Sequence, residues 1–253
     1  MTGDLGSTYD DAFYATLDAQ VRASAEVIVP IVVGLLSPES VLDVGCGRGT
    51  WLSVFQDAGV AQILGVDGPH IVAADLDIPS DAFIAQDLSQ PFGLDRRFDL
   101  AVSLEVGEHL PSEVAPAFVA SLVAHAPAVL FSAAIPFQGG AGHVTERWPS
   151  FWADLFAVHG YVPVDVVRPA VWGDERVAFW YAQNVVLYVD KNHADIEAIR
   201  DQASRVARPL DMVHPALHER DHTARRRPPP PPSLRRALKD VRGAAWRAFR
   251  RRA

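Results

Sequence analysis

Three glycines at intervals of two residues follow a short apolar segment in the first quarter of the chain. Residues 41–49 read VLDVGCGRG, which predicts a strand that runs into a glycine-rich turn. Such a turn lets the backbone approach a ligand closely, and the amide groups at the N-terminus of the next helix are free to bind it. Thr50 stands where the dinucleotide fingerprint has its third glycine or alanine. The loop therefore favours a ligand without a pyrophosphate.

Acidic side chains end the next two apolar segments. Asp67 closes the segment 65–67, where its two carboxylate oxygens can accept hydrogen bonds from both hydroxyls of a ribose. Asp87 closes the following segment and precedes Leu88, where a carboxylate can accept from the amino group of an adenine. Together with the glycine loop, these positions predict a ligand that contains a nucleoside.

In this order and at strand ends, these residues resemble the class I methyltransferase family, whose seven-stranded sheet binds S-adenosylmethionine at the same strand ends. The resemblance covers about residues 40–189. It implies that Asp43 and Gly45 line the methionine part, Asp67 the ribose, and Asp87 with Leu88 the adenine. The predicted cofactor residues are Asp43, Gly45, Gly47, Gly49, Trp51, Asp67, Asp87, Leu88 and Glu105.

Two acceptor classes require residues that this sequence lacks. Methylation of a cytosine carbon needs a cysteine nucleophile, and the single cysteine, Cys46, lies in the cofactor loop. Nucleic-acid enzymes of this fold that methylate amino groups carry Asn or Asp, two prolines and an aromatic residue after strand four. Here residues 103–111 read SLEVGEHLP. Two carboxylates and an imidazole in this segment favour an oxygen acceptor.

An acceptor hydroxyl must lose its proton during transfer, so a general base is expected. His143 is the first candidate, because it lies in a loop with three nearby glycines after the predicted fifth strand. His109 is a second candidate, as base, orienting residue or helix cap, and Glu105 is a third. The sequence shows no compact metal-ligand spacing, so no metal site is predicted. A divalent ion such as Mg²⁺, held by Glu105, His109, His143 or Glu146, is the alternative.

Aromatic, amide and carboxylate side chains gather in residues 134–156 and 179–189. Such a mixture suits a sugar ring, although aromatic residues of strands and helices are often core. The predicted substrate residues are Gln138, Glu146 and Trp148. This part of the chain resembles bacterial sugar O-methyltransferases of methylated mannose or glucose polysaccharide pathways, which implies a saccharide hydroxyl as the acceptor.

Three other functions stay open at the level of the sequence. The acceptor could be another natural product or a carboxylate, or the chain could be a scaffold that binds S-adenosylmethionine without catalysis. A nicotinamide dehydrogenase shares the sheet, but the missing third glycine and the absence of a Tyr-x-x-x-Lys pair argue against it.

The elements that must position these residues follow from hydrophobic periodicity. Strands are predicted at 40–44, 61–66, 82–86, 98–103, 127–133, 161–167 and 179–189, and helices at 50–58, 113–124 and 149–159. Their alternation predicts an α/β fold with a doubly wound, mostly parallel, seven-stranded Rossmann-like sheet. Residues 1–36 are predicted to be a helical flank or lid, and 1–215 form the predicted methyltransferase domain.

The charge distribution divides the chain into an acidic body and a basic tail. The net charge of −8 combines +10 in residues 225–253 with −18 in the rest. An acidic body repels a phosphate backbone, so no nucleic-acid partner is expected. Residues 216–233 are predicted to be an Arg/Pro-rich linker and 234–253 a basic amphipathic helix, which either contacts an anionic membrane or a protein or is a solvated tail.

The sequence contains no uninterrupted apolar stretch of membrane-spanning length and no basic-then-hydrophobic leader at its start. With a single cysteine, these features predict a cytoplasmic protein that could associate with membranes through its tail. A small molecule, most simply a carbohydrate, is the expected partner, and a homodimer is possible.

Overall fold

The computed structural model describes residues 11–204, 210–218 and 220. The chain divides into two units, Met1–Leu217 and His218–Ala253. The predicted basic helix lies outside the described residues, and the predicted linker does so except for 216–218 and 220. Both therefore stay predictions.

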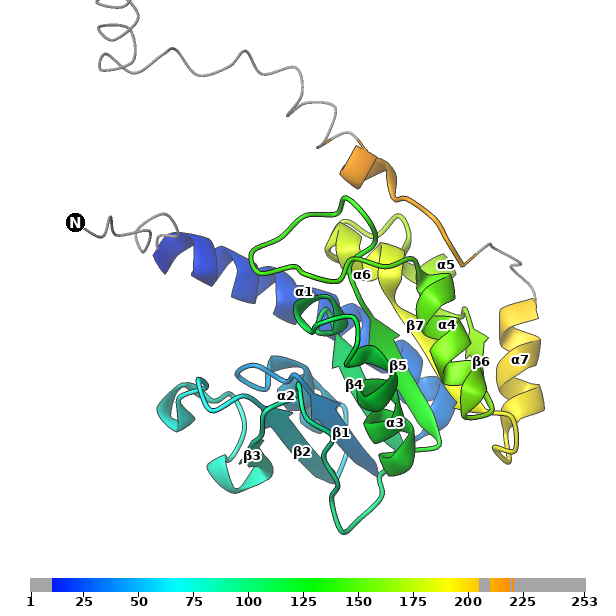
Figure 1. Ribbon diagram of the computed structural model, residues 1–253, viewed down its shortest axis with the longest axis horizontal. Coiled ribbons are helices and arrows are strands. Elements are labelled where there is room, and N and C mark those ends of the chain that lie inside the picture. The colour runs from blue at the N-terminus through cyan, green and yellow to red at the C-terminus, as the bar shows by residue number, and fades with distance from the viewer. Residues whose placement is uncertain (1–10, 205–209, 219, 221–253) are drawn as a thin grey trace, which may run out of the picture. The chain divides into compact units, whose positions relative to one another are not determined.

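A seven-stranded sheet forms the centre of the first unit, in the order β3-β2-β1-β4-β5-β7-β6 (Figure 1). The strands are β1 (Ser40–Val44), β2 (Gln62–Asp67), β3 (Phe83–Ala85), β4 (Leu100–Leu104), β5 (Ala128–Ser132), β6 (Tyr161–Val164) and β7 (Val186–Asp190). β7 pairs antiparallel with β5 and β6, and the other pairs are parallel. The predicted doubly wound, mostly parallel fold is confirmed.

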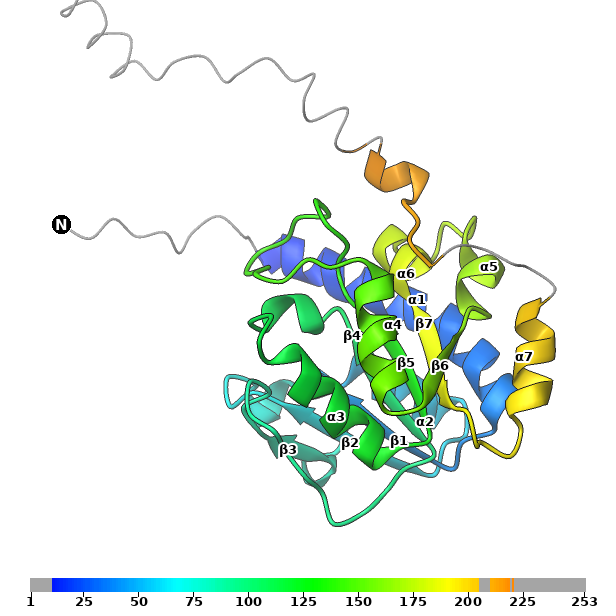
Figure 2. The same cartoon turned by 45° about the vertical axis from the view of Figure 1, so that its right-hand side comes forward.

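Helices cover both faces of the sheet (Figure 2). They are α1 (Asp11–Leu36), α2 (Thr50–Asp57), α3 (Ala115–His125), α4 (Pro149–Val158), α5 (Val167–Val171), α6 (Phe179–Asn184) and α7 (Ile196–Ser204), with short 3₁₀ turns η1 (Ala73–Asp75), η2 (Ser80–Ala82) and η3 (Gly107–His109). Because side chains of a strand alternate between faces, Val41 packs in the core with α1 and α2, whereas Leu42 packs in the core with α3 and α4. Fully buried Phe55 and Phe156 each contribute about 1.5–3 kcal/mol of hydrophobic stabilisation.

The predicted N-terminal helix is present as α1. By length and composition alone, its segment Asp18–Leu36 could cross a membrane, with a mean hydropathy of 1.6. The charged residues Arg22 and Glu26 lie within this segment. The buried face of α1, which includes Ile28 and Val32, belongs to the same hydrophobic core as α2 and α5. A helix packed in the core of a folded domain meets the same criterion, so this result by itself does not indicate a membrane span.

The prediction of one strand over residues 179–189 is wrong in its first half. Residues 179–184 form α6, and only 186–190 form β7. The aromatic residues favour a strand by propensity, but tertiary contacts decide the structure. The backbone N–H of Ala178 donates to Ser24 Oγ of α1 at 3.0 Å, and Tyr181 packs edge-on against Trp51 of α2. These contacts fix the start and the buried side of α6.

Candidate active site

A cavity of about 690 Å³ opens at the carboxyl ends of β1, β2 and β4. In a doubly wound sheet this edge is where ligands bind. The cavity wall contains six of the nine predicted cofactor residues, namely Gly45, Gly47, Asp67, Asp87, Leu88 and Glu105. The remaining three, Asp43, Gly49 and Trp51, are not part of the wall. The fold therefore brings most of the predicted set to one cavity.

The glycine loop follows β1 and takes a backbone conformation that suits glycine. Gly45 and Gly47 have φ angles of +84° and +55°. A Cβ atom on Gly45 would overlap Val106 Cγ2 and lie 2.9 Å from Val106 Cγ1, whereas a Cβ atom on Gly47 would meet no atom within 4 Å. The backbone N–H of Gly45 also donates to the carbonyl of Val66 at 2.7 Å. The loop is thus held between β2 and the segment that follows β4.

Asp67 organises the cavity at the end of β2. Its Oδ2 accepts from the backbone N–H of Gly47 at 2.7 Å, and its Oδ1 accepts from the N–H of Gly68 at 2.6 Å. Asp43 is only 3% exposed, and its burial, together with the charge of Asp67, raises the pKa of the Asp43 carboxyl. Trp51 is likewise buried. Contact of Asp43 and Trp51 with the cofactor stays a prediction.

We expect the substitution Asp67→Asn to weaken binding of S-adenosylhomocysteine about 10- to 100-fold. An amide places an N–H₂ group against one of the two backbone donors, and a hydrogen bond to a charged acceptor is worth about 1.5–3 kcal/mol. Calorimetric titration of the purified protein measures the loss. Asp87→Asn is the matched control with a smaller expected effect, and an equal loss in both variants would contradict the role of Asp67.

Asp87 lies on the exposed side of the same cavity. Its Oδ1 accepts from the backbone N–H and the hydroxyl of Ser89, at 2.9 and 2.7 Å. These hydrogen bonds lower the pKa of the Asp87 carboxyl, which is therefore ionised at neutral pH. Leu88 is buried beside it. A carboxylate and an apolar side chain can receive the amino group and the face of a purine ring.

Glu105 follows β4 in a left-handed conformation, with a φ of +56°. Such a backbone costs a non-glycine residue about 1–3 kcal/mol and is common at functional sites. The side chain is held by Asn184 Nδ2, which donates to Oε1 at 3.0 Å, and by Gln138 Nε2, which donates to Oε2 at 2.8 Å. Burial raises the pKa of Glu105, and these hydrogen bonds partly offset the rise. Glu105 is therefore a fixed carboxyl group at the cavity wall.

Gln138, a predicted substrate residue, belongs to this network. It is 4% exposed, and its Oε1 accepts from Asn184 Nδ2 at 2.9 Å and from Gln183 Nε2 at 3.2 Å. Gln183 and Asn184 are also buried. The amides of α6 thus position Glu105 from inside the protein. The sequence signal for this role is weak, because an amide in an apolar segment fits a core position and a site equally well.

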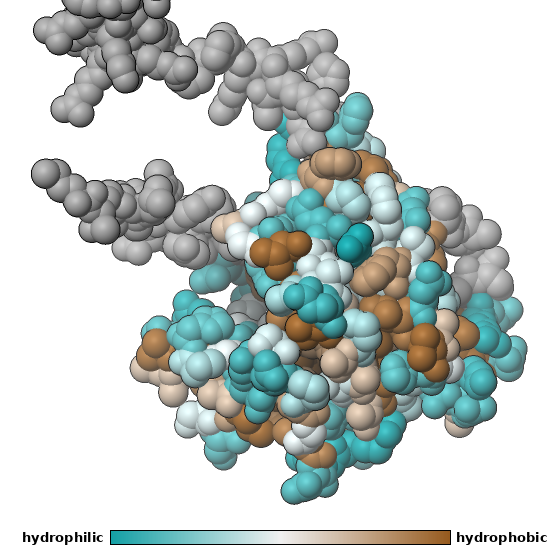
Figure 3. Space-filling view, viewed as in Figure 1, coloured by the Kyte–Doolittle hydropathy of each residue, from teal (hydrophilic) through white to brown (hydrophobic). Residues whose placement is uncertain are grey.

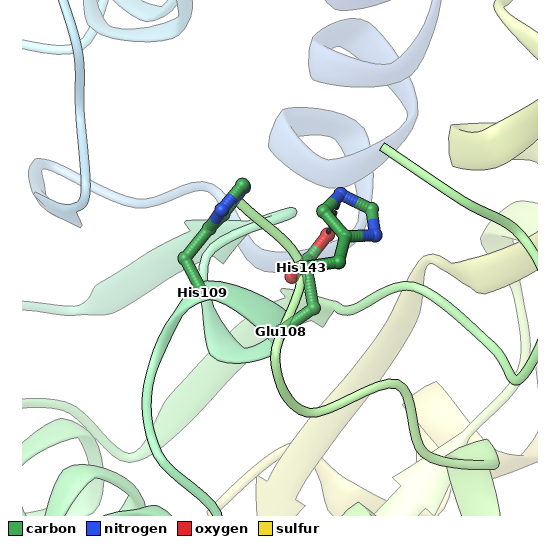
Figure 4. A group of neighbouring side chains, drawn as sticks. All are labelled: Glu108, His109 and His143. Atoms are coloured by element: carbon green, nitrogen blue, oxygen red, sulfur yellow. Dashed lines mark ion pairs between the residues drawn. The ribbon is translucent and has the colours of Figure 1, made fainter. Parts of the chain in front are cut away.

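Glu108, His109 and His143 meet beside the cavity (Figure 4). Their ligand atoms all lie within 4.8 Å of one another. The imidazole rings of His109 and His143 are edge-on, with 4.9 Å between their centroids. His109 is part of the cavity wall, whereas His143 is not. Partial burial and the neighbouring His143 lower the pKa of His109, which is therefore neutral at neutral pH.

Glu146, another predicted substrate residue, closes the loop that carries His143. Its Oε1 accepts from Gly139 N–H at 2.6 Å and lies 3.0 Å from His143 Nδ1, and its Oε2 accepts from Phe137 N–H at 2.8 Å. Burial alone would raise the pKa of Glu146, but the hydrogen bonds from His143, Gly139 and Phe137 lower it. Glu146 is thus an anionic anchor for the loop and for His143.

The surface of this loop is partly apolar. The face seen in Figure 3 mixes hydrophilic and hydrophobic residues, and the exposed large hydrophobic residues of the described part include Phe137, Val144 and Trp148. Phe137 is 83% exposed and has a φ of +70°. Trp148, the third predicted substrate residue, is 37% exposed. In contrast, Trp152 and Tyr181 are buried core residues.

The fold and the cavity define a class I methyltransferase, and comparison with known proteins agrees. Residues 18–151 match a family described as a methyltransferase domain. The chain belongs to this family and is an S-adenosylmethionine-dependent methyltransferase. A comparison with curated proteins finds no match.

Several solved structures are similar to the chain. The sugar N-methyltransferase KedS8 from Streptoalloteichus is 18% identical with a TM-score of 0.54, and the match covers 76% of this chain and 96% of that one. The magnesium protoporphyrin IX methyltransferase ChlM from Synechocystis, with S-adenosylhomocysteine bound, is 18% identical with a TM-score of 0.51, and the match covers 75% and 90%. DesVI from Streptomyces venezuelae is 25% identical with a TM-score of 0.43, and the match covers 57% of this chain and 64% of that chain. At 18% identity, the likeness to KedS8 and ChlM concerns the fold alone.

Proposed function

We propose that the protein transfers the methyl group of S-adenosylmethionine to a hydroxyl oxygen of a small molecule, and that the favoured acceptor is a saccharide. The observation that carries this proposal is the imidazole of His109 in the wall of the cofactor cavity, with His143 at 4.9 Å between ring centroids and the Glu105 carboxyl in the same wall. A hydroxyl acceptor requires such proton-accepting groups near the transferred methyl.

The proposed reaction is an in-line displacement. The acceptor oxygen attacks the methyl carbon, the S–CH₃ bond breaks with its electron pair left on sulfur, and the hydroxyl proton passes to the protein. The main task of the protein is alignment, since the sulfonium is already a reactive donor. His109 faces the cavity and is the proposed first proton acceptor, in place of His143, which the sequence favours. His143 is then the second imidazole, held by Glu146.

A saccharide acceptor is supported by exposed aromatic residues of the cover loop, which is the segment 133–148 between β5 and α4. Trp148 and Phe137 offer flat apolar faces in the segment that also carries the Glu146 carboxylate, and sugar rings stack on such faces while their hydroxyls bind polar groups. The buried amides Gln138, Gln183 and Asn184 support the carboxyl group from inside instead of contacting the sugar. The saccharide assignment therefore depends on the loop.

Methylation of an amino sugar is the second candidate. It is favoured by KedS8, which by its name methylates a sugar nitrogen and has the same fold as this chain. A neutral amine attacks through its own lone pair and loses its proton after transfer, so it needs no base in the transition state. A hydroxyl acceptor explains the two neighbouring imidazoles more simply, because only the hydroxyl needs a proton acceptor during transfer.

Matched acceptors separate these functions. Each sugar of a panel of methyl mannosides and glucosides is paired with its amino analogue, and formation of S-adenosylhomocysteine is followed with the full chain. We expect turnover of hydroxyl acceptors, with the new methyl ether located by NMR. Turnover of amines alone would replace the proposal with N-methylation, and cofactor binding without turnover of any acceptor would support a scaffold.

A further inference from the structure

Glu108 is a buried carboxyl group that is poorly satisfied by hydrogen bonds. It is 0% exposed, and neither Oε1 nor Oε2 makes a hydrogen bond of ordinary geometry with the described residues, although the backbone N–H groups of Glu108 and Ala134 and the Glu105 carboxyl are close enough to influence its pKa. A buried acceptor left in this state costs about 1–3 kcal/mol, and more when it is charged. Its backbone is well held, because its carbonyl accepts from the N–H groups of Val144 and Thr145 at 2.8 and 2.9 Å. The position of Glu108 is therefore fixed by its backbone, and its carboxyl group is only weakly satisfied within the protein.

Two imidazole nitrogens face these oxygens. His143 Nε2 lies 4.0 Å from Glu108 Oε1, and one nitrogen of His109 completes a group whose atoms are within 4.8 Å of one another. Figure 4 shows the two rings on either side of the carboxyl group. One carboxylate and two imidazoles are a common ligand set for a catalytic metal ion, and such sites keep one coordination position open.

The orientation of His143 also suits a metal ligand. Glu146 Oε1 lies 3.0 Å from Nδ1 of His143, so the carboxylate favours a proton on Nδ1 and leaves the lone pair of Nε2 toward Glu108. A carboxylate behind a histidine is the usual outer partner of a metal ligand, because it fixes the tautomer and the ring orientation. The loop between Phe137 and Glu146 therefore holds His143 with its Nε2 toward Glu108.

We propose that Glu108, His109 and His143 bind one divalent transition-metal ion of the Zn²⁺ type. Two nitrogen ligands and one oxygen ligand favour zinc or a similar ion over Mg²⁺, which prefers oxygen ligands. The contribution of the ion to methyl transfer rests on the proposed function, whereas its binding does not. A bound ion would lower the pKa of an acceptor hydroxyl at the open position, and the proton would then leave to solvent because His109 would hold the ion instead of accepting the proton. The alkoxide oxygen would attack the methyl carbon and the sulfur would keep the electron pair of the broken S–CH₃ bond, which gives the methyl ether and S-adenosylhomocysteine.

A shared proton is the competing explanation of the same carboxyl group. Burial and the neighbouring Glu105 raise the pKa of Glu108 to about 9, so without an ion this carboxyl is protonated at neutral pH. A stable proton between Glu105 and Glu108 requires no metal. The two explanations differ in whether the free protein takes up an ion at these three residues.

Calorimetric titration of the EDTA-treated full chain with ZnCl₂ and with MgCl₂ tests the proposal, and visible absorption of added Co²⁺ reports nitrogen and oxygen ligands directly. We expect one Zn²⁺ site, little binding of Mg²⁺, and at least tenfold weaker Zn²⁺ binding in Glu108→Gln and His109→Ala. His159→Ala removes an exposed imidazole outside the cluster and is the matched control with unchanged affinity. Binding of S-adenosylhomocysteine by each variant shows that it is folded.

Glu146→Gln keeps all three ligands and provides a second variant. We expect Zn²⁺ affinity to fall by about 10- to 100-fold with a changed Co²⁺ spectrum, since outer partners of ligands have effects of this size. Absence of Zn²⁺ uptake by the wild type, or equal affinity in the wild type and Glu108→Gln, would overturn the site. The titration contains no acceptor, so its failure leaves the acceptor panel to decide the proposed function separately.

Discussion

Replacement of His109 by alanine is expected to slow methyl transfer by about 10²- to 10⁴-fold, the usual contribution of a positioned proton-transfer group. His109 lies in the cavity wall, and its ring is edge-on to that of His143. Activity is expected to fall whether His109 acts as the proton acceptor or as a metal ligand, because the variant lacks the imidazole in both cases. Rates under saturating S-adenosylmethionine, with the best acceptor of the panel, measure the effect.

His70 provides the matched control for this substitution. It lines the same cavity, its side chain is 73% exposed, and its Nε2 lies 3.8 Å from Asp67 Oδ1 at the end of β2. His70→Ala should keep a rate near that of the wild type, with at most a modest change in cofactor affinity. A His109→Ala enzyme that is as active as His70→Ala would rule out the assignment of His109 and favour an acceptor that needs no base.

The substitution Gly45→Ala is expected to lower the free energy of unfolding by about 2–5 kcal/mol. A left-handed backbone costs an alanine about 1–2 kcal/mol, and overlap in a packed region adds about 1–3 kcal/mol. Here the new Cβ would overlap Val106, whose neighbour Glu105 belongs to the cavity wall. The displaced segment also carries the acidic and imidazole cluster. Cofactor affinity should therefore fall with stability, and urea unfolding of the cofactor-free protein measures the first quantity.

Gly47→Ala separates the two causes of this loss. Gly47 also has a positive φ, but its Cβ would meet no atom, so only the backbone cost of about 1–2 kcal/mol is expected. Val106→Ala in the Gly45→Ala background removes the overlapping methyl groups and should recover part of the stability. Equal destabilisation in Gly45→Ala and Gly47→Ala, without recovery in the double variant, would show that steric overlap has no part in the effect.

Local sequence patterns predicted the strand ends at which the cavity lies. The strand, glycine loop and helix of residues 40–57 are contiguous. Asp67 is the last residue of β2 and Asp87 follows β3, and the carboxyl ends of these strands meet at one edge of a parallel sheet. Backbone preferences and hydrophobic periodicity act over a few residues, so both can be recognised without tertiary information. The same reasoning failed for residues 179–184, where contacts with α1 and α2 override strand propensity.

The polar contacts of Glu105 and Glu108 depend on pairs of residues that are distant in the sequence. Glu105 is bound by Gln138 and Asn184, which lie 33 and 79 residues away, and Glu108 meets His143 of another loop. Whether Gln138 is buried or faces a substrate is a property of the packed core, and no periodicity encodes it. Likewise, the choice of His109 over His143 as the group in the cavity wall follows from the path of η3.

The sequence by itself therefore determined the class of fold and the cofactor, because a strand, a turn and a carboxylate at a strand end are local features with fixed geometry. Only the tertiary structure decided which polar side chains hold Glu105 from inside the protein and which side chains line the cavity. Hydrogen bonds and burial between segments far apart along the chain set that distinction, and these depend on how α6 and the cover loop pack against β4 and β5.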